Sequence, residues 1–444
     1  MKKILWLLLL FSAFIFTEKG TAAENLQAVI NSAKDGSVIK LEDKIYAGNI
    51  VIDKPLTLMG TNETLIEGDG KGNVISVRAP GVTISDLKVS KGGMDRNSAE
   101  EYAAIKIYTD GNVLRNIGID ESFHGIYLSK AHNNTIENVR VKGLGKEEIA
   151  AQGNGLHVYY SNGNLLINNY VVGTRDGMFF DYANDNKVIG NEITKTRYGL
   201  HFMYSDRNEF KNNIFTFNTG GAAIMHSNQL KLKNNQFIFN YGHRSFGLML
   251  LSANQNDIEN NTFYMNQRGL YIDQSTDNLI KSNQIFQNQI GIELWASSNE
   301  QVFTENKIEE NTIPAVTLGG SGRNDWSQEG TGNNWGTSFP LLDLDQNGVG
   351  DSPAIYKSSL YELIEDQELV YLFLKSPAIK VYEKMNQLMD NEKTMFEDQH
   401  PLTDSEKPNF YLSGLVIFAV IISAIIVKRR KLLCISFGRN GRKI

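Results

Sequence analysis

The sequence predicts an all-β protein, a right-handed parallel β-helix, and two observations support this prediction. The first is a repeat in which a glycine precedes a short alternating strand. The interval is 22 residues in most units, with one interval of 30 and one of 26. The glycines are Gly125, Gly155, Gly177, Gly199, Gly221, Gly247, Gly269 and Gly291. The second observation is that each unit holds several short strands and no helical period, which is typical of one coil of a solenoid.

The alternation within each unit predicts which side chains point into the solenoid. The first and third residues after each glycine are apolar, as Leu200 and Phe202 are after Gly199. We expect these residues to point inward, so that the second and fourth residues form the outer face of the strand. An asparagine nine residues after most of the glycines, such as Asn208, tolerates left-handed backbone angles. We expect these asparagines to form a stacked ladder between coils.

The N-terminal part of the chain contains a targeting segment and the start of the solenoid. Lys2-Lys3, an apolar run and Thr21-Ala22-Ala23 predict a signal peptide over residues 1–23. Residues 24–355 are expected to form one β-helical domain. The stretch from Glu24 to Ala33 has the pattern of a short amphipathic helix, which is suited to cap the open end of the solenoid.

The C-terminal part is predicted to lead to a membrane. Residues 356–409 have helical spacing and many acidic residues, which predicts a helical segment. The uncharged apolar stretch 410–427 predicts one transmembrane helix, and the basic tail 428–444 predicts its cytoplasmic side. The protein is therefore expected on the periplasmic side, anchored in the inner membrane. The single cysteine, Cys434, falls in the tail, so the exported body has no disulfide.

The distribution of charge narrows the classes of partner. The chain has a net charge of -6, although its last 17 residues hold seven Lys or Arg and no acid. The body is consequently acidic, which argues against binding to nucleic acid. Metal cations and basic proteins remain as partners.

The outer face of the strands carries an unusual mixture of side chains. Histidines, methionines and aromatic residues alternate there from one coil to the next, and this pattern predicts a recognition surface. We call this surface the binding stripe, and its candidate members are His157, Tyr159, Phe179, Asp181 and Tyr271. The alternative is that loops or the C-terminal segment cover this face.

Part of this face has the composition of a copper site. His201 and Met249 lie two coils apart, and only the small Ala223 separates them. An imidazole with thioethers is a soft ligand set that suits Cu(I) better than zinc or calcium. The interval of 26 adds a loop whose His243 is a candidate further ligand or lid. The candidate copper ligands are His201, Met203, Met225 and Met249.

A second metal prediction concerns an acidic loop near the end of the solenoid. Its oxygen-bearing residues have the spacing of the first nine positions of a calcium loop. The twelfth position is Ala354, so the bidentate acid is missing, and a plain turn built by Asp and Asn side chains is an equal alternative. The candidate ligands are Asp343, Asp345, Asn347 and Asp351.

Three segments, together with the repeats, resemble the NosD family. They are Gly242-His-Arg-Ser-Phe-Gly-Leu-Met-Leu250, Asn333-Asn-Trp-Gly336 and Asp343-Leu-Asp-Gln-Asn-Gly-Val-Gly-Asp-Ser-Pro353. Members of this family are exported accessory proteins for maturation of the copper enzyme nitrous oxide reductase. The resemblance implies a protein without catalytic activity that works during assembly of a copper–sulfur centre. The implied partners are the ATPase and membrane subunit of an ABC transporter, and nitrous oxide reductase or a copper chaperone.

A different class of function is open on the same repeats. Polysaccharide lyases and epimerases also use β-helices, and they need an acidic cluster with a proton acceptor on the outer face. Arg175 and Arg197 stack one coil apart beside Asp176 and Asp181, and could form such a cluster. The same residues also suit ordinary ion pairs between strands. A carbohydrate-binding surface protein is the third class.

Overall fold

The structure is a computed structural model that describes residues 25–95, 97–145, 148–242 and 244–403. The predicted signal peptide, the stretch 410–427, the basic tail and His243 lie outside the described residues. Among the residues described, no helix combines the length and the apolar character that crossing a membrane requires.

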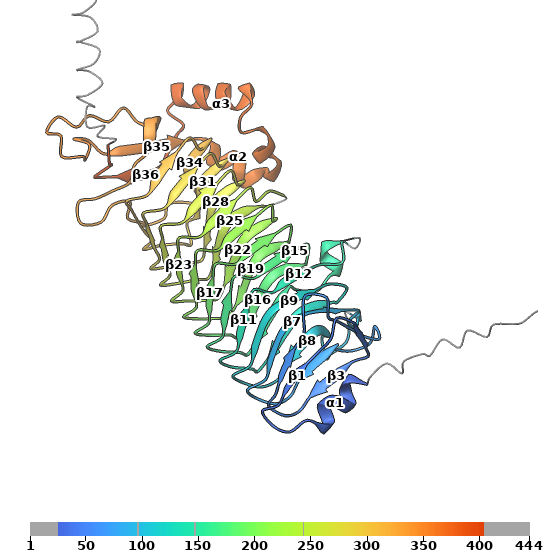
Figure 1. Ribbon diagram of the computed structural model, residues 1–444. Helices are drawn as coiled ribbons and strands as arrows, with labels where there is room; N and C mark the ends of the chain where they lie inside the picture. Colours follow the sequence, from blue (N-terminus) through green and yellow to red (C-terminus); the bar gives the residue numbers. More distant parts are fainter. Residues whose placement is uncertain (1–24, 96, 146–147, 243, 404–444) are drawn as a thin grey trace, which may run out of the picture.

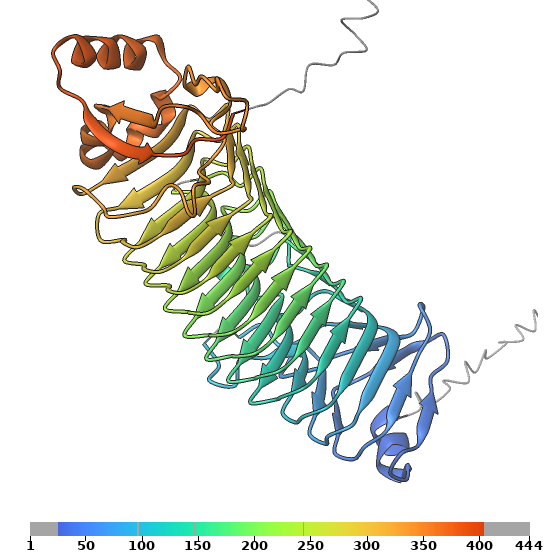
Figure 2. The same ribbon diagram turned by 90° about the vertical axis from the view of Figure 1, so that its left-hand side faces the viewer.

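The described chain winds into a parallel β-solenoid, with its coils stacked from α1 at one end to α2 and α3 at the other (Figures 1 and 2). Each regular coil gives one long strand to a twelve-stranded parallel sheet and two short strands to a second sheet. The strands of the twelve-stranded sheet are β3 (Ile50–Ile52), β6 (Ile75–Val77), β8 (Ala103–Ile107), β10 (His124–Ser129), β13 (Leu156–Tyr159), β16 (Asp176–Asp181), β19 (Tyr198–Met203), β22 (Gly220–Met225), β25 (Phe246–Leu251), β28 (Arg268–Asp273), β31 (Ile290–Trp295) and β34 (Ile313–Leu318).

A 22-stranded sheet covers the other sides of the solenoid, and its strands have three residues each except the longer β7 and β9. They are β1 (Val38–Lys40), β2 (Ile45–Ala47), β4 (Thr57–Met59), β5 (Leu65–Glu67), β7 (Thr83–Ser90), β9 (Val113–Ile119), β11 (Thr135–Glu137), β12 (Arg140–Lys142), β14 (Leu165–Ile167), β15 (Tyr170–Val172), β17 (Lys187–Ile189), β18 (Glu192–Thr194), β20 (Glu209–Lys211), β21 (Ile214–Thr216), β23 (Lys231–Lys233), β24 (Gln236–Ile238), β26 (Asp257–Glu259), β27 (Thr262–Tyr264), β29 (Leu279–Lys281), β30 (Gln284–Phe286), β32 (Val302–Thr304) and β33 (Lys307–Glu309).

The register of the twelve-stranded sheet is the one that the glycine spacing predicts. His201 pairs with Phe179 on one side and with Ala223 on the other, and Ala223 pairs in turn with Met249. The inward residues, such as Phe202, are fully buried and stack on their counterparts in the next coil. The parallel solenoid fold is therefore confirmed.

The asparagine ladder is also confirmed. The side chain of Asn186 donates a hydrogen bond to Oδ1 of Asn208 over 3.1 Å, and Asn164 donates to Asn186 over 3.0 Å. The same oxygens accept the backbone N–H of the preceding coil. Because these amides are buried, the ladder satisfies polar groups that would otherwise destabilise the fold.

The two ends of the described solenoid are capped by different elements. At the N-terminal end lies α1 (Leu26–Ser32), whose first turn is capped by Asn25, so the predicted helical cap is confirmed. At the other end lie α2 (Leu360–Asp366) and α3 (Pro377–Leu388). The remaining short helices are the 3₁₀ turns η1 (Ile149–Ala151), η2 (Gly336–Ser338) and η3 (Glu368–Phe373).

The C-terminal cap differs from the predicted helical segment 356–409 in two strands, one of which includes residues 356–358. Residues 393–398 were expected to be helical, but they form the strand β36 (Lys393–Asp398), which pairs antiparallel with β35 (Ala354–Ser358). The strand forms because Met395 and Phe396 bury their side chains against the end of the core. Asp398 follows them and accepts hydrogen bonds from the backbone of Asn333 and from the indole of Trp335, over 2.7 and 2.9 Å. The Asn-Trp segment therefore ties the cap to the last coils.

Candidate functional site

The outer face of the twelve-stranded sheet is the candidate site, and it is partly covered. The outward side chains of His157, Met249 and Glu293 are buried, which agrees at these positions with the alternative of a covered face. They are covered because neighbouring outward rings lie over them and because the C-terminal cap folds back onto this face. Tyr371 of the cap, for example, donates a hydrogen bond to Glu293 over 2.7 Å.

His201 is held in one orientation by a buried carboxylate. Its Nδ1 lies 3.0 Å from Oδ2 of Asp176, and its ring stacks on Phe179 with 4.6 Å between the ring centres. Asp176 also accepts two hydrogen bonds from Arg197, over 2.8 and 2.6 Å. An ionised carboxylate only accepts hydrogen bonds, so Nδ1 of His201 carries the proton. In the neutral ring, Nε2 of His201 then has a free lone pair.

The charge of Asp176 follows from the same contacts. Burial alone would raise the pKa of Asp176, but the hydrogen bonds from His201 and Arg197 outweigh it and bring the pKa below its usual value. The carboxylate is therefore ionised at neutral pH. A histidine whose second nitrogen donates to a carboxylate is the arrangement that proteins commonly use to orient a metal ligand.

The predicted methionines divide into two positions. Met249 and Ala223 form a small buried cluster with Phe246, and Met225 packs against it. Met203 pairs with Met225 in the register of β19 and β22. The sequence analysis missed Phe246, which stands on the outer face just before its glycine and helps to enclose the space over Ala223. Two of the predicted thioethers are thus brought to one apolar cluster.

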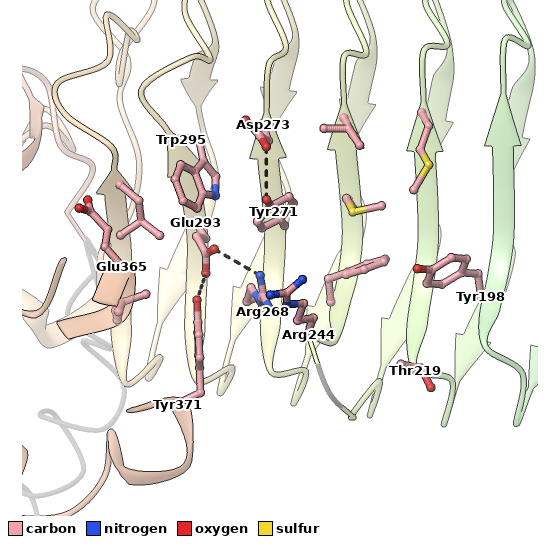
Figure 3. A pocket seen from close by; sticks show the side chains of 16 residues that line it. Tyr198, Thr219, Arg244, Arg268, Tyr271, Asp273, Glu293, Trp295, Glu365 and Tyr371 are labelled. Atoms are coloured by element: carbon pink, nitrogen blue, oxygen red, sulfur yellow. Dashed lines mark hydrogen bonds and ion pairs between the residues drawn. The ribbon is translucent and has the colours of Figure 1, made fainter. Parts of the chain in front are cut away.

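This cluster forms one wall of a pocket with a volume of about 610 Å³ (Figure 3). Met225 and Met249 line the pocket, whereas His201 and Met203 do not. Its other walls come from the outer face between β28 and β34 and from the C-terminal cap. The polar and aromatic residues that line it are Tyr198, Thr219, Arg244, Arg268, Tyr271, Asp273, Glu293, Trp295, Glu365 and Tyr371.

A buried ion pair lies at the cap side of the pocket. Arg268 donates to Glu293 over 3.3 Å, and its guanidinium lies 5.1 and 5.0 Å from the ring centres of Tyr271 and Tyr371 (Figure 3). Burial raises the pKa of Glu293 above its ordinary value, although Arg268 and Tyr371 act in the opposite direction. Because Tyr371 belongs to η3, its hydrogen bond to Glu293 joins the cap to the solenoid face.

A second group of possible metal ligands lies nearer the N-terminal end. Donor atoms of Glu101, His124 and His157 lie within 4.8 Å of one another. However, Nδ1 of His124 accepts the backbone N–H of Asn154 over 2.9 Å, so the neutral ring carries its proton on Nε2. A metal ion at Nε2 would have to displace that proton. His124 therefore has no free lone pair for a metal ion, in contrast to Nε2 of His201.

The sequence analysis gave His157 a place in the binding stripe but did not single out His124. The two rings pack edge to face, with 5.3 Å between their centres. His124 stands just before its glycine, which is also the position of Asp176 in its own coil. The position just before the glycine was therefore the sequence signal that could have identified His124 as a residue of the outer face. The other members of the stripe lie along the same face, and Tyr159 and Asp181 pair in register.

Two of the residues proposed for a lyase or epimerase site form an ion pair. Asp176 is bonded to Arg197, whereas Arg175 is exposed. Burial raises the pKa of Asp181, which stands four residues after Gly177. The contact between Asp176 and Arg197 has the same form as the exposed ion pair of Asp185 and Arg207. In both pairs an arginine donates two hydrogen bonds to an aspartate of the preceding coil.

The acidic loop uses its side chains on its own backbone. Asp343 accepts from the backbone N–H of Asn347 and Gly348, and Asp351 accepts from the N–H of Leu344. Asp345 also accepts from Asn347. These bonds are those of a turn built by Asp and Asn side chains, and calcium remains a prediction.

Comparison with known sequences finds matches to one family over part of the chain. The model of the NosD family, described as periplasmic copper-binding protein, matches residues 144–338. A "Probable ABC transporter binding protein NosD" of Pseudomonas aeruginosa is 31% identical over 134 residues, which is 30% of this chain and 31% of that protein. Its namesake in Stutzerimonas stutzeri is 24% identical over 137 residues, 30% of each chain. The matches thus span about a third of the length of these relatives.

Comparison with solved structures shows the fold alone. The A-module of a mannuronan C-5 epimerase from Azotobacter vinelandii aligns with a TM-score of 0.55 at 14% identity, over 68% of this chain and 93% of that chain. A family 28 exopolygalacturonase from Yersinia enterocolitica aligns with a TM-score of 0.51 at 10% identity, over 71% and 75%. The sequence matches are the specific ones, and over residues 144–338 they confirm the resemblance of this chain to the NosD family.

Proposed function

We propose that the protein is an exported accessory protein without catalytic activity that handles copper for the copper–sulfur centre of nitrous oxide reductase. It would act with the ATPase and membrane subunit of an ABC transporter. Its partner in copper transfer would be nitrous oxide reductase or a copper chaperone. The description of the matching family as copper-binding supports the copper part of this proposal. The names of the two relatives support the transporter part.

The observation that carries the proposal is the contact between Asp176 and His201. It leaves the Nε2 lone pair of His201 available. The thioether of Met203 on the same strand, and those of Met225 and Met249 on the next two strands, would complete the ligand set. Cu(I) prefers such soft ligands. Copper is here a cargo, so an open ligand set on one sheet face would suit reversible loading.

The test is a competition titration of the protein with a Cu(I) chelator. Asp176→Asn removes the charge behind His201, and we expect a loss of Cu(I) affinity of about 10- to 100-fold. His201→Ala combined with Met249→Leu should weaken binding further, because it removes two ligands. Circular dichroism and thermal melting show whether each variant is folded.

Matched controls separate the site from general effects. Asp185→Asn breaks the equivalent exposed pair with Arg207, which has no histidine, and should leave the affinity unchanged. Met265→Leu removes a thioether that does not line the pocket and should also have no effect. Equal affinities for the wild type, Asp176→Asn and the double variant would refute a copper site at His201.

The cellular part of the proposal has its own measurement. In a deletion strain we expect nitrous oxide reductase with a low copper content and little activity, and restoration by the wild-type chain. The double variant should restore neither. Normal copper content in the deletion strain would contradict the proposal and favour the alternatives, a polysaccharide lyase, an epimerase or a carbohydrate-binding surface protein.

A further inference from the structure

The C-terminal cap exposes an apolar surface at the end of the molecule. In α3 and at its C-cap, four apolar side chains recur at the spacing of one helix face and are between 55% and 78% exposed: Val381, Met385, Leu388 and Met389. The preceding turn η3 exposes Leu369, Leu372 and Phe373 to a similar degree. We call these seven side chains the cap surface. Exposed apolar side chains gathered in one short stretch of chain are typical of an interaction site.

The opposite side of α3 is already used. Ile379 is buried against the cap, and Tyr382 and Glu383 are half-buried. Burial raises the pKa of Glu383 above its ordinary value. The helix therefore has one side that packs on the protein and a second apolar side with no partner among the described residues.

Within the cap surface the charged side chains are mostly lysines, although exposed acids flank it in sequence at Glu365, Asp366 and Asp390. Between Leu369 and Met389 the exposed charged side chains are Lys375, Lys380 and Lys384, and Glu383 is the single acid. A helix with apolar side chains on one face and lysines beside them is typical of helices that lie in the headgroup region of a bilayer. Lysines there are attracted by anionic lipids.

The sequence that follows the cap would bring this surface close to a membrane. After Thr403 only six residues precede the uncharged apolar stretch 410–427. Fully extended, the chain from Thr403 to Phe410 spans at most about 25 Å. Both ribbon views place α3 at the end of the molecule where the described chain stops, away from the coils (Figures 1 and 2).

We propose that the cap surface lies on an anionic phospholipid bilayer, with its apolar side chains among the headgroups and its lysines on the lipid phosphates. This inference rests on the proposed anchor at 410–427 and adds a second contact beside it. Two contacts would fix the angle of the solenoid to the membrane, whereas a single helix with a short link would leave it free.

The test uses the full chain, in which Cys434 is the only cysteine. Cys434→Ser with Leu388→Cys places one NBD label on the cap surface. Cys434→Ser with Val51→Cys places the same label on an exposed residue at the other end of the solenoid. Both proteins are reconstituted into phosphatidylcholine vesicles with increasing phosphatidylglycerol. We expect a blue shift of the emission and quenching by doxyl lipids at position 388, and neither at position 51.

Two charge variants test the surface without removing the anchor. Met385→Glu with Met389→Glu should abolish the shift at position 388, while thermal melting stays unchanged because both residues are exposed. Lys380→Glu with Lys384→Glu should remove the dependence on phosphatidylglycerol.

The possible failures are distinguishable. If the protein floats with vesicles but the label at position 388 stays in water, the proposed lipid contact of the cap surface is wrong and the anchor at 410–427 is supported. If the protein does not float, the lipid contact and the anchor are both wrong. If the label is shielded without lipid and in proportion to protein concentration, a second copy covers the surface and the inference is overturned.

Discussion

At the scale of residues, the position of one proton separates the histidines of the outer face. His201 donates from Nδ1 to Asp176 and keeps a lone pair on Nε2, whereas His124 accepts at Nδ1 and carries its proton on Nε2. Distances alone would favour His124 and His157, because their donor atoms lie close together beside Glu101. The hydrogen-bond partners reverse that preference, since a metal ligand needs a lone pair.

The buried His124 also makes a prediction for stability. Burial, assisted by the charge of Lys106, lowers its pKa to about 3, compared with about 6.5 for the unfolded chain. Between these values the unfolded state binds the extra proton, so the free energy of unfolding falls as pH falls from about 6.5 to about 3. The slope is about 1.4 kcal/mol per pH unit for this group. Urea titrations at pH 7.5 and pH 5 measure it.

His124→Asn provides the comparison, because its side-chain oxygen can still accept the N–H of Asn154 but does not titrate. We expect the free energy of unfolding of this variant to depend less on pH, because about one proton fewer is taken up on unfolding. His226→Asn, at an exposed histidine, should leave it unchanged. A His124→Asn protein with the wild-type slope would show that His124 is not the group responsible.

The residue scale is also where sequence reasoning reached its limit. It placed His201, Met225 and Met249 correctly on one face, because strand alternation fixes the side on which each lies. It could not supply the partners. Asp176 reaches His201 from the preceding coil, and Phe246 closes over Ala223 through its ring. Such contacts depend on side-chain direction, which a period of 22 residues does not specify.

At the scale of elements, the repeat determined most of what could be predicted. Every long strand from β10 to β31 has the predicted register, because one buried glycine and two inward apolar residues recur in each coil. The cap has no repeat, and so β36 was predicted as helix. Its strand state depends on pairing with β35, some 40 residues earlier, which no local pattern announces.

The register makes a prediction about deletions. Removing Gly269 to Ile290 takes out one coil of 22 residues and joins Arg268 to Gly291, so every inward side chain stays inward. Removing only Gly269 to Gln289 leaves one residue too many and turns the strand faces over, which buries polar side chains. We expect the first protein to keep its circular dichroism and melt cooperatively. The second should melt at a much lower temperature, and similar melting of both would contradict the register.

At the scale of the whole molecule, the chain shares its fold with sugar-processing enzymes, so the fold alone does not decide its function. The structural neighbours establish the solenoid, and at 10–14% identity they establish nothing about chemistry. On this chain the face carries thioethers, imidazoles and an Asp–Arg pair, and the cap folds over its end. The distinction between the proposed functions therefore lies in the side chains of a single sheet face.

The orientation of the molecule in the cell gives the last prediction. A signal peptide over 1–23 and an apolar stretch at 410–427 would place the whole solenoid on the periplasmic side, joined to the inner membrane by its C-terminal end. Protease added to osmotically opened cells should then release a soluble fragment whose N-terminus is Glu24. Intact cells should yield no fragment, because the outer membrane excludes the protease. The solenoid should resist cleavage because its backbone is paired along both sheets, so we expect the releasing cut between Thr403 and the apolar stretch. Recovery of the body in the cytosolic fraction, or its protection in opened cells, would contradict this topology and with it the proposed meeting with a periplasmic reductase.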